Sequence, residues 1–236
     1  MLISKKPIGT MSYLGGVYAV PELFCWFWGQ TIDYTKEYLC KPDEYVHLLR
    51  SISSYHITAR NNLSRNFFGD WLLMMDTDQI AEPDIVARMV TLMYEKDLDV
   101  LTALYRYKAY PFLPSVYHYN GCAFDVVSEL NWNADLVPID CCGAGTLLVR
   151  RRVFDRIRGE LHEEPFESLG VTGGSERLSE DFSFCERLRR LGIQLWLAPK
   201  IYSRHLMVKP IENEDYDPSM VQTVPIPTGG QKVIRA

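Results

Sequence analysis

The stretch WLLMMDTDQI, residues 71–80, gives the clearest indication of the fold class in this sequence. Its first five residues are apolar and run directly into two aspartates, Asp76 and Asp78. An uninterrupted apolar run of this length predicts a strand that is buried on both faces, as in a parallel sheet. In open α/β sheets the ligand crevice lies outside the carboxyl ends of the strands. The two carboxylates are therefore expected at the edge of the sheet where ligands bind.

The sequence on either side of this run alternates between extended and helical patterns. Strands are expected at VYAV, YVHLLRS and DVLTALYRY, residues 17–20, 45–51 and 99–107. Helices are expected over residues 31–40 and 53–68 and from Pro83 onward. Strands that alternate with helices in this way predict an α/β sheet rather than a sandwich.

The second half of the chain is less regular. Its expected elements are, in order, a strand broken by a glycine turn over 139–151, a short helix over 153–158, a mobile loop over 159–179, a helix whose apolar stripe is Phe184, Cys185, Leu188 and Leu191, and a strand over 193–199. From Lys209 onward four prolines and the absence of a periodic pattern predict a tail or a lid.

Bulk properties indicate an ordinary globular protein. The 236 residues suit one domain, and 47% hydrophobic and 23% charged residues are typical values. A net charge of −5 gives no general reason to bind a polyanion. The six cysteines form no CxxC pair, so we expect reduced thiols and a cytoplasmic protein. No apolar stretch approaches the roughly 20 residues of a membrane helix, so no stable membrane insertion is expected.

The spacing of the two aspartates permits a metal site. In a strand, residues two apart point to the same side, so Asp76 and Asp78 can face one ligand. Carboxylate oxygens suit Mg²⁺ or Mn²⁺ shared with a substrate diphosphate. A simpler interpretation is that the aspartates cap the helix that begins near Pro83.

Three further segments carry residues that can do chemistry, and each also has a structural interpretation. In Ser179-Glu180-Asp181 a carboxylate can act as a general base, or the segment can simply begin a helix. His205 can complete a metal shell or be structural. The glycines of CGAG, residues 142–145, can let a ligand approach the backbone or can make a turn.

The order of these segments resembles a known family. VYAVPE, TARN, MMDTDQ, CGAGTLLVRR, SEDFSFCERLRRLG and SRHL follow one another as in the nucleotide-sugar glycosyltransferases of GT-A fold, especially the family-2-like group. The resemblance implies a Rossmann-like, mixed but mostly parallel sheet flanked by helices in one domain. That domain would span residues 1–208, with a nucleotide-binding half over about 15–108, an acceptor half over about 109–208 and a tail or lid over 209–236.

The resemblance also assigns roles to individual residues. Donor binding falls on Pro21, Glu22, Arg60, Asn61, Asp76, Gly143 and Gly145. The metal ligands would be Asp76, Asp78 and His205, with Asp78 binding directly as part of a DxD motif. The catalytic base would be Asp181, with Glu180 beside it.

The implied activity is a metal-dependent, hexosyltransferase-type transfer of sugar from a nucleotide-sugar donor to an acceptor hydroxyl, with inversion. Mn²⁺ or Mg²⁺ would be the cofactor and a UDP-sugar the default donor. The usual base-reading acid after the second strand has no counterpart between Arg50 and Ser54. The acceptor stays open among a saccharide, a protein side chain, a lipid-linked sugar, a small molecule and a modified DNA base.

Two alternatives to a glycosyltransferase remain. A sugar nucleotidyltransferase would usually carry a glycine-rich, basic loop after the first strand, whereas PELFCWFWGQ, residues 21–30, has one glycine and no basic residue. A catalytically silent binding domain would keep the scaffold, but retention of both aspartates of DTD, the ED pair and His205 speaks against it.

Overall fold

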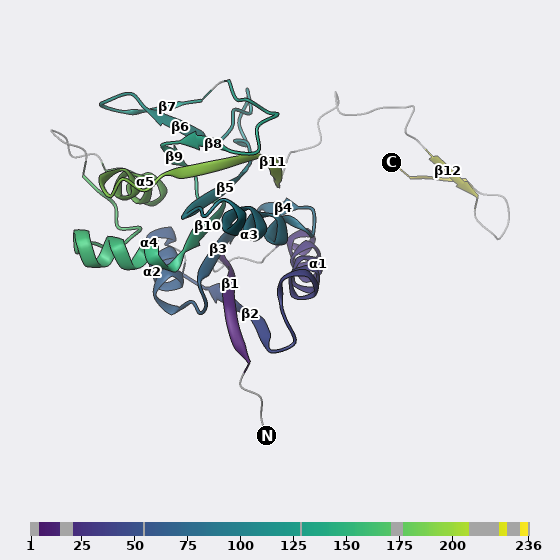
Figure 1. Cartoon of the computed structure of the whole chain (residues 1–236). Helices are drawn as coiled ribbons and strands as arrows, with labels where there is room; N and C mark the ends of the chain where they lie inside the picture. The colour runs from purple at the N-terminus through teal and green to yellow at the C-terminus, as the bar shows by residue number, and fades with distance from the viewer. Residues whose placement is uncertain are drawn as a thin grey trace. The chain divides into compact units, whose positions relative to one another are not determined.

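The computed structural model contains two compact units, Met1–Leu206 and Met207–Ala236 (Figure 1). It describes residues 5–14, 21–53, 55–127, 129–170 and 177–207, together with the backbone of 222–225 and 232–235. In the smaller unit, β12 (Gln222–Pro225) pairs antiparallel with β13 (Lys232–Arg235). Residues 208–221 lie outside the described residues, so the assignment of residues 209–236 as a tail or lid stays a prediction.

The larger unit is built on one mixed sheet with the strand order β2-β1-β3-β10-β5-β11-β4 and with β8 paired to β11. The strands are β1 (Lys6–Leu14), β2 (Glu44–Ser51), β3 (Trp71–Asp76), β4 (Gln79–Ala81), β5 (Val100–Leu104), β8 (Val137–Ile139), β10 (Thr146–Arg150) and β11 (Leu195–His205). The strands β1, β2, β3, β5 and β11 run in one direction, and β4, β8 and β10 run in the other. The mixed, mostly parallel sheet is therefore confirmed.

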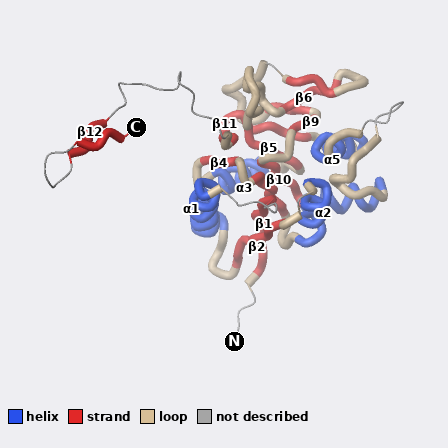
Figure 2. Tube along the Cα trace, turned by 180° about the vertical axis from the view of Figure 1, so that it is seen from behind, coloured by secondary structure: helices blue, strands red, loops and turns tan. Residues whose placement is uncertain are grey.

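Helices cover both faces of this sheet (Figures 1 and 2). They are α1 (Glu22–Leu39), α2 (His56–Asn66), α3 (Ile85–Glu95), α4 (Arg151–Arg156), which continues into a π-helical turn at Ile157–Leu161, and α5 (Glu180–Arg190). The strand β3 shows why both faces are covered, because its side chains alternate between two cores. Trp71, Leu73 and Met75 pack with α1 and α3, whereas Leu72 and Met74 pack with α2, α4 and α5.

The first strand differs from the expectation. VYAV at 17–20 lies outside the described residues, and the observed β1 is Lys6–Leu14. Polar residues interrupt the apolar pattern of this segment, so the sequence did not predict a strand there. In the fold these polar side chains find hydrogen-bond partners. Thr10 Oγ1 donates to the Phe68 carbonyl at 2.8 Å, and Ser12 Oγ donates to the Leu73 carbonyl at 2.7 Å.

The first helix is longer than expected. It starts at Glu22, directly after Pro21, instead of at residue 31. The aromatic segment that obscured its start supplies the buried face, with Phe24, Phe27 and Trp28 in the core. Proline is well tolerated just before the first turn because its missing N–H would have no partner there.

The irregular region 108–138 contains part of a small antiparallel sheet. Its strand order is β7-β6-β9, with β6 at Val116–Tyr119, β7 at Phe124–Val126 and β9 at Cys141–Cys142. The expected mobile loop begins within the π-helical turn, and its residues 171–176 lie outside the described residues.

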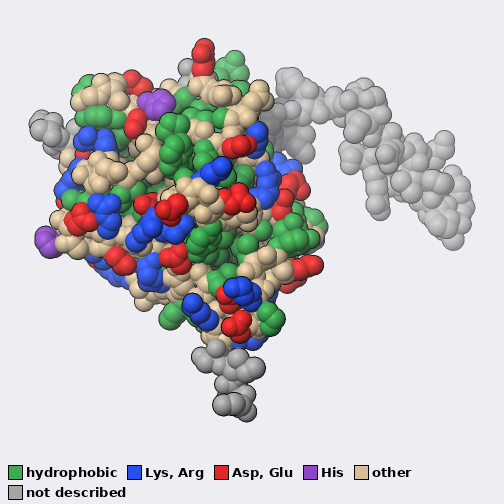
Figure 3. All heavy atoms as spheres, viewed as in Figure 1, with side chains coloured by type: hydrophobic (Ala, Val, Ile, Leu, Met, Phe, Trp, Pro, Cys, Tyr) green, Lys and Arg blue, Asp and Glu red, His purple; other side chains and the backbone are tan. Residues whose placement is uncertain are grey.

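The surface and the cysteines give little that is specialised. All six cysteines are free thiols. On the face shown in Figure 3, acidic and basic side chains are interspersed. Within the described part of the chain, no helix combines the length and the apolar character that crossing a membrane requires.

Candidate active site

A cavity of about 190 Å³ opens at the carboxyl edge of the parallel strands and collects most of the predicted site residues. The predicted residues that line it are Arg60, Asp76, Gly143, Gly145, Glu180, Asp181 and His205. They come from α2, β3, the turn before β10, α5 and β11. Residues up to 145 positions apart in the chain thus share one site.

Strand directions explain this convergence. Because β10 runs antiparallel to β3, its first residue Thr146 pairs with Met75 at the carboxyl end of β3. The glycine turn that precedes β10 therefore lies beside the aspartates, and the Asp76 N–H donates to the Gly145 carbonyl at 2.9 Å. At the end of β11, His205 pairs with Gln79 of β4, which directly follows DTD.

Arg60 ties two of the predicted acids together. Its side chain is 3% exposed, and its Nη2 donates to both Asp76 oxygens, at 3.0 and 3.3 Å. Its Nη1 donates to Glu180 Oε1, and His56 Nδ1 lies 3.5 Å from the same oxygen. Burial works against ionisation, but the hydrogen bond with His56 and the charge of Arg60 lower the pKa of Glu180 to about 2. Glu180 is thus held as a carboxylate by the Arg60 guanidinium and the His56 imidazole.

Asp181 has a different environment. Burial raises its pKa, and the hydrogen bond from Ser179 and the charge of Arg60 only partly offset this rise. Its Oδ1 accepts the Ser179 hydroxyl and the Phe182 N–H, the latter at 2.9 Å. Ser179 occupies the N-cap position of α5 but makes no side-chain cap hydrogen bond to the backbone. The hydroxyl expected to cap the helix instead orients the carboxylate.

Asp78 lies beside His205. Asp78 Oδ2 pairs with Lys108 Nζ. Its Oδ1 is buried, lies 3.7 Å from His205 Nε2 and has no hydrogen-bond partner among the described residues. His205 Nδ1 is 2.7 Å from the Arg106 carbonyl oxygen, which can only accept a hydrogen bond. In a neutral imidazole the hydrogen therefore sits on Nδ1, and the lone pair of Nε2 faces Asp78.

The three predicted metal ligands do not form one cluster. Among the residues that the structure describes, no group of three or more His, Cys, Asp or Glu side chains could hold a metal ion. Arg60 engages both oxygens of Asp76, which leaves Asp78 and His205 as the pair that faces a common point. An unpartnered carboxylate oxygen and an imidazole nitrogen fit a Mn²⁺ or Mg²⁺ ion that completes its shell from the substrate.

Three predicted donor-binding residues lie outside the cavity lining. Pro21 and Glu22 begin α1 and are exposed. Asn61 is 4% exposed, and its Oδ1 accepts the N–H of Phe166 at 2.9 Å, so its side chain holds the segment before α5. The donor-binding roles of these three residues stay predictions.

Two residues that the sequence pattern did not single out also shape the site. Tyr105, which directly follows β5, accepts the Gly145 N–H at 3.2 Å and packs edge-on against His205. A Cβ on Gly143 would lie 2.1 Å from the Tyr105 hydroxyl, so only glycine fits there. His56 lies one helical turn before Arg60, and this i, i+4 spacing is the signal that would have found it.

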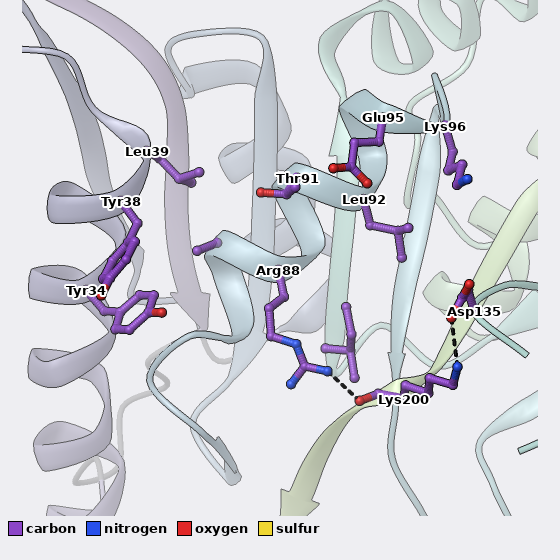
Figure 4. Close-up of a pocket in the computed structure, with 12 residues that line it drawn as sticks. Tyr34, Tyr38, Leu39, Arg88, Thr91, Leu92, Glu95, Lys96, Asp135 and Lys200 are labelled. Atoms are coloured by element: carbon purple, nitrogen blue, oxygen red, sulfur yellow. Dashed lines mark hydrogen bonds and ion pairs between the residues drawn. The ribbon is translucent and has the colours of Figure 1, made fainter. Parts of the chain in front are cut away.

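A larger cavity of about 580 Å³ lies between α1 and α3 (Figure 4). It holds none of the predicted site residues. Three of its charged residues already pair with one another: Arg88 Nη2 donates to the Lys200 carbonyl at 2.7 Å, and Lys200 Nζ donates to Asp135 at 2.8 Å. We therefore take the smaller cavity, which the predicted acids and glycines line, as the candidate active site.

The Rossmann-like, mixed and mostly parallel sheet with helices on both faces is consistent with the GT-A fold. The sequence profile described as Glycosyl transferase family 2 matches residues 30–158, more than half of the chain. The chain belongs to glycosyl transferase family 2, and it is a glycosyltransferase. No curated protein matches it in sequence.

Solved structures share the fold. The crystal structure of A197 from STIV has a TM-score of 0.50 at 15% identity, over 86% of this chain and 98% of that one. GalNAc-T7 with UDP, GalNAc and Mn²⁺ has a TM-score of 0.55 at 11% identity, over 95% of this chain and 46% of that one. At such identities the likeness concerns the fold alone.

Proposed function

We propose that this glycosyltransferase moves a sugar from a UDP-sugar to an acceptor hydroxyl with inversion, and that Asp181 is the base. The observation that carries the proposal is the meeting of Asp76, the glycine turn and Asp181 in one cavity at the carboxyl edge of the sheet. GalNAc-T7, which shares the fold, was solved with UDP, GalNAc and Mn²⁺, which supports a UDP-sugar donor and a divalent cation.

The two acids of the ED pair are suited to different tasks. With a pKa of about 2 and hydrogen bonds from Arg60 and His56, Glu180 is a weak base that keeps its charge. Burial raises the pKa of Asp181, so its carboxylate gains more by taking the proton of an attacking hydroxyl. Asp181 is therefore the base, and Glu180 holds Arg60 in position.

Arg60 and the glycine turn shape the part of the cavity that would bind the donor. Burial raises the pKa of Asp76 and the charge of Arg60 partly offsets this rise, while its two hydrogen bonds fix the orientation of the carboxylate at the cavity wall. The missing side chains of Gly143 and Gly145 let Tyr105 pack against the glycine turn at the cavity wall. Pro21 and Glu22 would complete the nucleotide pocket as the resemblance implies.

Asp78 and His205 would hold the divalent cation. When bound, the cation supplies positive charge that stabilises the departing diphosphate. The Arg106 carbonyl fixes the imidazole with Nε2 toward Asp78. Lys108 supplies a second positive charge at the same carboxylate.

The test is nucleotide release from a panel of UDP-sugars with Mn²⁺, compared between wild type and Asp181→Asn. Asparagine keeps the shape but cannot take a proton, so we expect a loss of about 10²- to 10⁴-fold in rate. Asp135→Asn, on an exposed carboxylate paired with Lys200, is the matched control. The anomeric configuration of the product, read by NMR, reports inversion. Nucleotide binding without release in the wild type, or full activity in Asp181→Asn, would contradict the proposal.

A further inference from the structure

A second cavity, of about 470 Å³, adjoins the candidate active site. It lies between the β6–β7 hairpin, which contributes Tyr119 and Phe124, and α5, which contributes Phe182 and Glu186. Phe182 lines both cavities, and its neighbour in the chain is Asp181. A ligand in the second cavity is therefore one side chain away from the proposed base.

Aromatic rings form a continuous wall that runs from the first cavity, which Tyr117 lines, to the second, which Phe124 and Tyr119 line. The Tyr117 and Phe182 centroids are 4.6 Å apart, those of Phe182 and Phe124 are 5.5 Å apart, and those of Phe124 and Tyr119 are 5.4 Å apart. Rings that pack on one another in this way lose little conformational entropy when a ligand arrives. The wall is thus a preformed surface for an apolar face.

Charged groups complete the second cavity along one face of α5. Phe182, Glu186 and Arg190 follow one another at i, i+4 and i+8, so they lie in a row. Glu186 accepts two hydrogen bonds from Arg189, at 2.8 Å each, and Arg190 pairs with Glu163 at 2.8 Å. These pairs hold a carboxylate and a guanidinium beside the aromatic wall, where they can accept and donate further hydrogen bonds.

We propose that this second cavity binds the acceptor and that the acceptor is a saccharide. The inference rests on the proposed function, because it requires an acceptor hydroxyl to reach Asp181, the residue that precedes Phe182. A sugar ring has C–H faces that pack on aromatic rings and hydroxyls that both donate and accept hydrogen bonds. The charges of Glu186 and Arg190 balance, so the lining has no excess positive charge to attract a polyanionic acceptor, and two charged side chains disfavour an aliphatic one. The volume lies in the range of about 300–1,000 Å³ that is usual for small-molecule sites.

The experiment separates transfer to water from transfer to a sugar. Nucleotide release from the UDP-sugar panel is measured without acceptor and then with the methyl glycosides of glucose, galactose, mannose and N-acetylglucosamine and with lactose. The variants are Tyr119→Ala and Phe124→Ala. The matched control is Tyr38→Ala, an exposed tyrosine in the larger cavity between α1 and α3. Saturation-transfer NMR of the same glycosides on the UDP-loaded protein reports binding directly, and circular dichroism confirms that each variant is folded.

We expect at least one saccharide to accelerate release. Tyr119→Ala and Phe124→Ala should leave release into water within about twofold and lower kcat/KM for the saccharide by about tenfold, mainly through KM. Tyr38→Ala should change neither quantity.

Other results overturn the inference. Acceleration by 4-nitrophenol or by a threonine-containing peptide but by no saccharide would refute the acceptor class. Saccharide transfer that is unchanged in both variants would refute the site, and so would release into water with neither saccharide acceleration nor saturation transfer. Absence of release from every donor would instead refute the proposed function, and saturation transfer lost in Phe124→Ala would still support the sugar site.

Discussion

Replacing Arg60 by methionine is the sharpest test of how the site is held together. Methionine is apolar and unbranched, so it fills much of the space but removes the cation between Asp76 and Glu180. The Arg60 side chain is 3% exposed, so water cannot take its place without rearrangement. Breaking a buried ion pair on one side costs about 3–5 kcal/mol, because the remaining charges are left unpaired.

The pKa of Glu180 gives an independent magnitude. Its fall from 4.5 to about 2 corresponds to about 3 kcal/mol of stabilisation, at about 1.4 kcal/mol per pH unit. A carboxyl whose folded pKa is depressed stabilises the fold above its unfolded pKa and loses that contribution as the pH falls through its folded pKa. The stabilisation by Glu180 is therefore complete above about pH 4.5 and is lost towards pH 2.

The assay is urea unfolding of wild type and Arg60→Met at neutral pH and at several pH values between 4.5 and 2. We expect a loss of about 3 kcal/mol at neutral pH, at the low end for a broken buried ion pair, because the hydrogen bond with His56 still stabilises the Glu180 carboxylate in the variant. The difference in the free energy of unfolding between the two proteins should become smaller below pH 4.5. Glu180 is then protonated in the variant, and towards pH 2 the wild type also loses its Arg60–Glu180 ion pair.

Arg65→Met on the same helix is the matched control. Arg65 pairs with Glu164 at 2.9 Å but is 49% exposed, so its removal should cost less than about 1 kcal/mol. Equal losses in Arg60→Met and Arg65→Met, or a gap that does not change with pH, would refute the reasoning.

Further predictions concern the glycine turn and the cation pair. Gly143→Ala should lower the free energy of unfolding by about 1–3 kcal/mol, because its Cβ would lie 2.1 Å from the Tyr105 hydroxyl. Tyr105→Phe should restore part of that loss when the two are combined; independent, additive losses in urea unfolding would contradict the clash. Gly29→Ala, in the middle of α1 with nothing within 4 Å of its Cβ, should instead stabilise the protein by about 0.5–1 kcal/mol in the same assay, and a loss of stability there would be inconsistent with open space. Lys108→Met should tighten Mn²⁺ binding about two- to fivefold, because the ammonium competes with the cation for Asp78. Electron paramagnetic resonance of free Mn²⁺ measures this affinity, and unchanged or weaker binding would show that the two cations do not compete.

The local sequence pattern was enough to predict the elements whose own apolar residues form a continuous run or stripe. The run Trp71–Met75 forms β3, and all five of its side chains are 0% exposed. The stripe of Phe184, Cys185 and Leu188 faces the core from α5. In both cases the apolar period of one segment sets which face is buried, whatever its neighbours are. The position of DTD at the end of β3 follows from the same run.

Other elements depend on partners that are distant in the chain. Lys6–Leu14 is a strand because Thr10 and Ser12 find acceptors in the Phe68 and Leu73 carbonyls, which no local pattern reveals. Residues 31–40 captured only the second half of α1, because the core that receives Phe24 exists only after the sheet has formed.

The sequence predicted which residues belong to the candidate site. How these residues are arranged depends on the tertiary structure. The motifs placed acids and glycines on separate segments, and only the antiparallel insertion of β10 brings the glycine turn to Asp76. Arg60 meets Glu180 across 120 residues of chain, and that ion pair leaves Asp181 as the proposed base. Strand order and direction arise from the packing of the whole sheet, whereas the periodicity of a segment reports only which of its own faces is buried.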